Sequence, residues 1–203
     1  QGDGPLALVF RHLAALCDSD LSRLSDFGDM HGLQVFLQSG GPHSVQPLRQ
    51  DYPPLHFMLS EYGIEFRFRP LDFIQVNARL NEVMIRRAIE LLRPTPEDEV
   101  LDLFCGLGNF TLPLARSVAQ VVGVEGDAGL VARAAENAEL NGIGNARFFA
   151  ADLNEDIATQ QWSRQQFTKL LIDPPRAGAL EVLKRLDLDG IERIVYVSCH
   201  PAS

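Results

Sequence analysis

The sequence predicts an α/β protein in which a parallel sheet is preceded by a small α+β unit. From Asn77 onward, short β-prone runs alternate with helical patterns, and five such runs are readable. Strands separated by helices in this way imply a parallel sheet covered on both faces. Residues 1–75 lack this alternation. We therefore expect an α+β domain at 1–75 and the sheet domain at 76–203.

The first domain is expected to contain two strands, one helix and a hairpin. The strands are predicted at 6–10 and 34–37, with a helix between them at 20–30. The segment HFMLSEYGIEFRFRP alternates apolar and polar residues around Gly63, as a β-hairpin does.

The second domain is expected to begin with a helix at 78–92, where apolar residues recur at helical spacing until Pro94 and Pro96 end the pattern. Strands are predicted at EVLDLF, QVVGVEG, ARFFAAD, FTKLLIDPP and RIVYVS, and further helices at NFTLPLARSV, AGLVARAAENAELNG and ALEVLKRL. The chain ends directly after the fifth strand, so we expect a sheet that is truncated there.

Composition indicates an ordinary soluble globular protein, with 46% hydrophobic and 22% charged residues. No run reaches the roughly 18 apolar residues that span a bilayer, and the N-terminus lacks a signal-peptide pattern. The net charge of −9 and a pI near 5.0 argue against a broad, non-specific nucleic-acid binder. This charge does not exclude an enzyme that binds one RNA through a local surface. We expect a cytoplasmic protein without membrane contact.

The three cysteines, Cys17, Cys105 and Cys199, are an odd number without metal-like spacing. A disulfide framework or a metal site is therefore not expected.

Glycines and polar residues follow the predicted strands, at the carboxyl ends where open α/β sheets bind ligands. Gly106 and Gly108 follow the first strand and lead into a helix, so a ligand can approach the backbone closely. Thr111 stands where the dinucleotide fingerprint has its third glycine. This departure disfavours a nicotinamide-dependent oxidoreductase, which stays the rival enzyme class.

Acidic residues at the next strand ends favour S-adenosylmethionine instead. Glu125 ends the second strand, where a carboxylate can hold both ribose hydroxyls. Asp152, at the end of the third strand, can accept from an adenine amino group, and Asp173 heads the DPPR segment at the end of the fourth. Arg176 takes the place where amino-group methyltransferases often carry an aromatic residue, which argues against an exocyclic nitrogen as methyl acceptor.

Cys199 has two interpretations. A cysteine at a strand end is often inert packing. Methylation of uracil at C5, however, needs a thiolate that adds to C6, and the strand of Cys199 is predicted beside the DPPR loop. Cys105 lies inside the glycine loop, where its small size suits a structural role.

Five ordered segments resemble the bacterial RNA (uracil-5-)-methyltransferases, which make 5-methyluridine in tRNA or rRNA: FIQVNARLN, LDLFCGLGNFTLPLA, VVGVEG, LLIDPPRAGA and IVYVSCHPA. The resemblance covers nearly the whole chain. DFIQVNA and LDLFCGLGNFTLPLA look most like the branch that modifies 23S rRNA, with the tRNA branch as the alternative.

The resemblance implies that 76–203 is a Rossmann-like class I S-adenosylmethionine-dependent methyltransferase domain in a monomer that acts on 23S rRNA. It implies that Cys199 is the nucleophile and that Arg176 belongs to the substrate side of the DPPR loop. The residues expected to bind the cofactor are Gln75, Phe104, Gly106, Asn109, Glu125, Asp152 and Asp173.

Three departures from the family pattern matter. His200 replaces the asparagine that usually follows the nucleophile. The N-terminal oligonucleotide-binding domain and the cysteines for a 4Fe-4S cluster are not among these 203 residues. The proton-abstracting glutamate and the last two strands would follow Ser203. We therefore expect an inactive fragment of the enzyme, with a non-catalytic RNA-binding paralogue as the second alternative.

Overall fold

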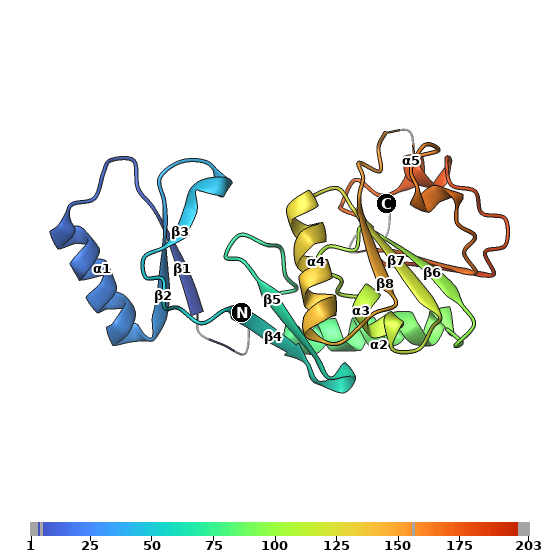
Figure 1. The fold of residues 1–203 in the computed structure, drawn as a ribbon, viewed down its shortest axis with the longest axis horizontal. Helices are drawn as coiled ribbons and strands as arrows, with labels where there is room; N and C mark the ends of the chain where they lie inside the picture. Colours follow the sequence, from blue (N-terminus) through green and yellow to red (C-terminus); the bar gives the residue numbers. More distant parts are fainter. Residues whose placement is uncertain (1–3, 5, 156, 199–203) are drawn as a thin grey trace. The chain divides into compact units, whose positions relative to one another are not determined.

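The computed structural model describes residue 4 and residues 6–155 and 157–198. The chain divides into two compact units, Gln1–Met58 with Glu65–Ala78 and Leu59–Ile64 with Arg79–Ser203 (Figure 1).

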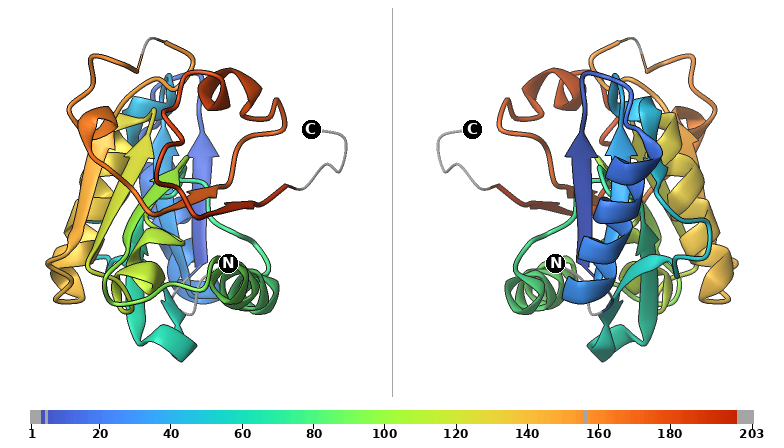
Figure 2. Two further views of the ribbon diagram at one scale, coloured as in Figure 1. Left: turned by 90° about the vertical axis from the view of Figure 1, so that its right-hand side faces the viewer. Right: turned by 90° about the vertical axis from the view of Figure 1, so that its left-hand side faces the viewer.

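The first unit contains a parallel strand pair joined by a helix. β1 (Leu6–Arg11) pairs with β2 (Leu33–Gln38), and α1 (Asp18–His31) lies against the pair (Figure 2). The two predicted strands and the helix between them are confirmed. β3 (Val45–Pro47) adds an antiparallel partner to β2 after the short helix η1 (Pro42–Ser44). Sequence reasoning missed β3, because three residues are too few to show an alternating pattern.

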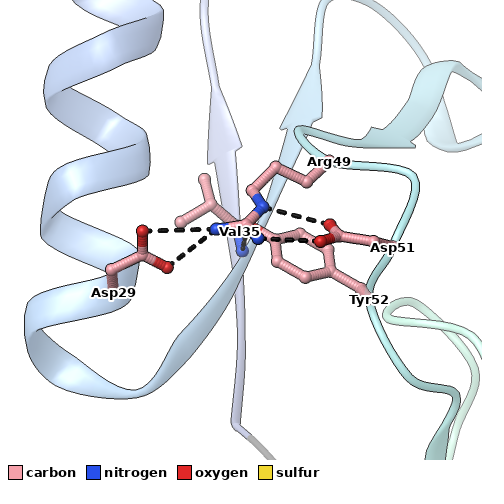
Figure 3. Close-up of polar contacts among 5 residues, drawn as sticks. All are labelled: Asp29, Val35, Arg49, Asp51 and Tyr52. Atoms are coloured by element: carbon pink, nitrogen blue, oxygen red, sulfur yellow. Dashed lines mark hydrogen bonds and ion pairs between the residues drawn. The ribbon is translucent and has the colours of Figure 1, made fainter.

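Polar contacts tie the C-terminal end of α1 to the loop after β3 (Figure 3). The Arg49 guanidinium bridges two carboxylates, with Nη1 2.9 Å from Asp29 Oδ1 and Nη2 2.8 Å from Asp51 Oδ2. In the same loop, Tyr52 Oη accepts a hydrogen bond from the backbone N–H of Val35 in β2 at 3.2 Å. These contacts hold the loop against the strand pair.

The predicted hairpin is also present. β4 (Leu55–Leu59) and β5 (Ile64–Phe68) pair with each other, joined by η2 (Ser60–Tyr62) and Gly63. Gly63 has a φ of 61°, a left-handed conformation that glycine adopts without a steric penalty.

The second unit is built on a five-stranded parallel sheet within the described residues. The strands are β6 (Glu99–Leu103), β7 (Gln120–Glu125), β8 (Ala146–Ala150), β9 (Lys169–Ile172) and β10 (Arg193–Tyr196). Their order across the sheet is β10-β9-β6-β7-β8, and every pairing is parallel. The predicted α/β class is confirmed. Because the chain runs outward from β6 to β8 and then returns to β9, the order reverses between β6 and β9, where such sheets bind ligands.

The helices of this unit are α2 (Ala78–Leu92), α3 (Thr111–Ala115), α4 (Ala128–Leu140) and α5 (Leu180–Leu183), with a short helix η3 (Trp162–Arg164). α3 and α5 are shorter than predicted. Beyond α3, the backbone N–H of Ala119 bonds to the carbonyl of Asp98, so the chain must leave the helix to reach the sheet.

Both faces of the central strands β6, β7 and β9 are buried. One face packs on a core cluster in which Trp162 is fully buried, and its strand residues are Leu101, Leu103, Val122, Val124, Leu170 and Ile172. The opposite face carries Asp102, Gly123 and Leu171, which lie side by side in register on β6, β7 and β9. In the part of the chain that the structure describes, no helix is long and apolar enough to cross a membrane.

Candidate functional site

The candidate site lies at the carboxyl ends of β6, β7, β8 and β9, which parallel pairing brings to one edge of the sheet. The residues that the sequence places there are Phe104, Gly106, Asn109, Glu125, Asp152, Asp173 and Arg176.

The loop after β6 has an unusual backbone. Phe104 has a φ of 63°, which is a strained conformation for a bulky residue. Its half-buried ring packs against the core cluster of the sheet. Gly106 and Gly108 follow with φ values of 54° and 89°, and a Cβ at Gly106 would meet nothing within 4 Å. The glycine loop therefore has open space at Gly106, as close approach of a ligand requires.

Glu125, the last residue of β7, is held by backbone donors. Its Oε2 accepts from the N–H of Gly106 at 3.1 Å, and its Oε1 accepts from the N–H of Asp127 at 3.1 Å. Each carboxylate oxygen has two lone pairs, so Glu125 can still accept bonds from a ligand. The contact with Gly106 fixes the carboxylate beside the glycine loop.

The remaining carboxylates differ in burial. Asp152 is exposed and lies two residues beyond the end of β8, where its Oδ1 accepts from the backbone and side chain of Asn154. Asp173 follows β9 directly, and burial raises its pKa to about 6. Arg176 is exposed in the turn after Asp173.

Asp102, near the end of β6, is a further acidic residue at this edge of the sheet. Its side chain is fully buried, and Oδ2 accepts from Thr111 Oγ1 at 2.5 Å. Among the described residues, Oδ1 has no hydrogen-bond partner. Burial raises the pKa of Asp102 to about 8, and the charges of Asp173 and Glu125 act in the same direction. The carboxyl is therefore mostly protonated at pH 7.

Asn109 pairs with a residue that sequence reasoning missed altogether. Asn81, on α2, is 3% exposed and forms two side-chain hydrogen bonds with Asn109. The only sequence signal is a polar residue within the apolar stripe of α2.

The remaining candidate residues are Gln75, Cys199, His200 and Cys105. Gln75 is half-buried in the first unit, in the segment between β5 and α2. Cys199 and His200 lie outside the described residues. Cys105 is buried in the glycine loop, and burial raises the pKa of its thiol well above the usual range. Within the described ranges, no group of three or more His, Cys, Asp or Glu residues could hold a metal ion.

Comparison with known proteins identifies the family of this chain. Residues 7–203 match the model of the family described as tRNA (Uracil-5-)-methyltransferase. A 23S rRNA (uracil(1939)-C(5))-methyltransferase RlmD from Stenotrophomonas maltophilia (strain R551-3) is 60% identical over 202 residues. The protein of that name from Xanthomonas axonopodis pv. citri (strain 306) is 59% identical. Each match covers 100% of this chain but 46% of the relative, so the chain spans about half the length of these proteins.

A solved structure shows the same fold. The tRNA (uracil-54, C5)-methyltransferase of Pyrococcus abyssi, in complex with S-adenosyl-L-homocysteine, superposes with a TM-score of 0.71 and 24% identity. The alignment covers 96% of this chain and 46% of that one. The extent of the family match, over nearly the whole chain, shows that this protein belongs to the RNA (uracil-5-)-methyltransferase family.

Proposed function

We propose that this chain is the central and cofactor-binding part of an enzyme that transfers a methyl group from S-adenosylmethionine to C5 of a uridine in 23S rRNA. The observation that carries the proposal is the open glycine loop between carboxylates at the switch point of the sheet. The RNA target is inferred from the relatives at 59–60% identity, which are named as 23S rRNA methyltransferases.

The charges at the strand ends suit S-adenosylmethionine better than a dinucleotide. Glu125, Asp152 and Asp173 offer acceptors for hydroxyl and amino groups. The same carboxylates would repel the pyrophosphate of a nicotinamide cofactor. Glu125 would hold the ribose, Asp152 the adenine, and the glycine loop with Phe104 and Asn109 would line the remaining space. Gln75 is proposed as a further contact from the family pattern alone.

The bound cofactor supplies an electrophilic methyl group on a sulfonium sulfur. Cys199 Sγ, as a thiolate, would add to C6 of the uracil, and the electron pair of the C5–C6 bond would move into an enolate. C5 would then form the bond to the methyl group as the sulfonium bond breaks. After a base removes the C5 proton, the C6–S bond breaks and releases the thiolate.

The position of β10 supports Cys199 as the nucleophile. β10 is the parallel neighbour of β9, and pairing continues beyond it, because the N–H of Val197 bonds to the carbonyl of Ile172 at 2.8 Å. Asp173 and Arg176 follow Ile172 at the end of β9. The strand that leads to Cys199 thus runs beside the strand that leads to the DPPR loop. Arg176, exposed in that loop, is proposed to face the RNA.

We also propose that the 203 residues alone turn over little or nothing, because the family resemblance implies a proton-abstracting glutamate after Ser203. The 4Fe-4S cluster that the family branch carries would belong to sequence N-terminal to Gln1. A tRNA target and a non-catalytic role in RNA binding are the alternatives.

The test uses the full-length natural protein with RNA that contains 5-fluorouridine, which traps the covalent adduct because fluorine at C5 cannot leave as a proton does. We expect an adduct with a 23S rRNA fragment that disappears in Cys199→Ala. The matched control is Cys17→Ala, which alters an exposed cysteine of the first unit and should keep the adduct.

An adduct that persists in Cys199→Ala would place the nucleophile elsewhere. Transfer of a labelled methyl group to tRNA rather than to 23S rRNA would favour the tRNA alternative. No transfer to either RNA would favour the non-catalytic one.

A further inference from the structure

We infer that Asn81 is a positioning residue for the cofactor site, which acts by fixing the carboxamide of Asn109. The inference rests on the proposed function, since it assigns a task to the glycine loop in binding S-adenosylmethionine.

The two carboxamides form a closed pair. Asn81 Nδ2 donates to Asn109 Oδ1 at 2.8 Å, and Asn109 Nδ2 donates back to Asn81 Oδ1 at 2.9 Å. If the Asn109 amide turned over by half a rotation, nitrogen would face nitrogen and oxygen would face oxygen, and both bonds would be lost. The Asn109 amide therefore cannot turn over by itself, but only together with the amide of Asn81.

The position of Asn81 indicates that this contact is its main interaction. The buried residues of α2 are Asn81, Ile85, Ala88 and Leu92, which recur at the spacing of one helical face. Asparagine is a poor helix former, and a buried amide without a partner costs free energy. An apolar side chain would suit this stripe better unless the amide were needed. The side chain of Asn81 bonds to Asn109, which lies in the glycine loop.

The pair leaves Asn109 with capacity for a ligand. A carboxamide has two N–H donors and two acceptor lone pairs, and the pair uses one of each. Because the two amides can turn over only together, Asn81 restricts how Asn109 presents its spare donor and its spare acceptor.

The loop around Asn109 is anchored a second time. Thr111 Oγ1 donates to the buried Asp102 Oδ2, two residues after Asn109. With the backbone anchored there, the remaining freedom of Asn109 is that of its own side chain, and the pair with Asn81 restricts it.

The experiment measures the binding of S-adenosylhomocysteine to the full-length natural protein by calorimetry, together with KM for S-adenosylmethionine and kcat. The variants are Asn81→Ala, Asn109→Ala and the double variant. The control is Ile85→Val, which trims a fully buried side chain one turn further along α2. Circular dichroism and the melting temperature show that each variant is folded.

We expect Asn81→Ala to raise the dissociation constant and KM about tenfold, as expected for a lost side-chain hydrogen bond of about 1.4 kcal/mol, with a smaller change in kcat. If Asn81 acts through Asn109, the double variant binds no more weakly than Asn109→Ala alone. Ile85→Val should lower the melting temperature and leave the dissociation constant unchanged.

An unchanged dissociation constant in Asn81→Ala, or additive losses in the double variant, would overturn the inference while leaving the proposed function intact. Absence of binding to the wild-type protein would instead overturn the proposed function, and the inference with it.

Discussion

Replacing Asp102 by asparagine should stabilise the second unit, although it alters a fully buried residue at the heart of the sheet. One carboxyl oxygen of Asp102, Oδ2, accepts a hydrogen bond from Thr111. The other, Oδ1, has no hydrogen-bond partner among the described residues. Burial, aided by the charges of Asp173 and Glu125, raises its pKa to about 8 from an ordinary value of 3.8. An amide in that place can still accept from Thr111 and carries no charge to desolvate.

The sign of the effect follows from proton linkage. Between the ordinary pKa and about 8, the folded protein keeps a proton on Asp102 that the unfolded chain has released. The free energy of unfolding therefore falls as the pH rises through this window. Each pH unit lowers it by about 1.4 kcal/mol, so that wild type loses roughly 4 kcal/mol between pH 5 and 8 from this group. In Asp102→Asn, the free energy of unfolding does not fall with pH for this reason, because asparagine does not titrate. Burial also raises the pKa of Asp173, and because that residue is present in both proteins, the effect of its own burial cancels in the comparison.

Urea denaturation of the 203-residue chain at several pH values measures the effect. The single tryptophan, Trp162, is fully buried in the core of the second unit, so its fluorescence reports unfolding of that unit. The difference in unfolding free energy between Asp102→Asn and wild type should grow steadily from pH 5 to pH 8. A difference that stays constant over this range would refute the protonated, uncompensated state of Asp102.

Asp98 provides the matched control, because it is a second buried aspartate, directly before β6. Burial alone would raise its pKa, but hydrogen bonds from Thr168, Thr95 and Lys169 outweigh burial and lower it. This carboxylate stabilises the fold above its ordinary pKa and loses that contribution only as the pH falls through its lowered value. Asp98→Asn should thus destabilise the chain by about 3–5 kcal/mol, with no trend between pH 5 and 8.

Two further predictions concern the opposite face of the sheet and the thiols. Gly123→Ala should lower the free energy of unfolding by about 1–3 kcal/mol in the same urea assay, because the new Cβ would lie 2.8 Å from Phe148 Cδ1 and 2.9 Å from Cys105 Sγ. An unchanged urea midpoint would show that this face of the sheet is loosely packed. In a variant without the third cysteine, Ellman's reagent should label the exposed Cys17 at once and Cys105 only after unfolding, because Cys105 is buried and its thiol pKa is raised. Rapid labelling of two thiols in the native protein would contradict this burial.

The sequence was sufficient for the sheet and for the polar ends of its strands, because parallel strands must bring their carboxyl ends to one edge. Glu125 and Asp173 could be located in this way. The contact between Asn81 and Asn109 could not, because it joins side chains 28 residues apart through tertiary packing. The short length of α3 also escaped prediction, since it depends on where the chain must meet the sheet.

The two buried aspartates of this region have opposite effects on stability. Directly before β6, Asp98 is ionised, pairs with Lys169 and stabilises the fold. Four residues later, Asp102 stands neutral at the ligand end of the same strand, with one oxygen unpartnered within the described residues. The next two positions are Leu103 and the strained Phe104, so the unfavourable features gather at one end of one strand. A fold under selection for stability alone would remove such costs by a single substitution, as Asp102→Asn would do. Their place beside the open glycine loop supports the proposed cofactor site.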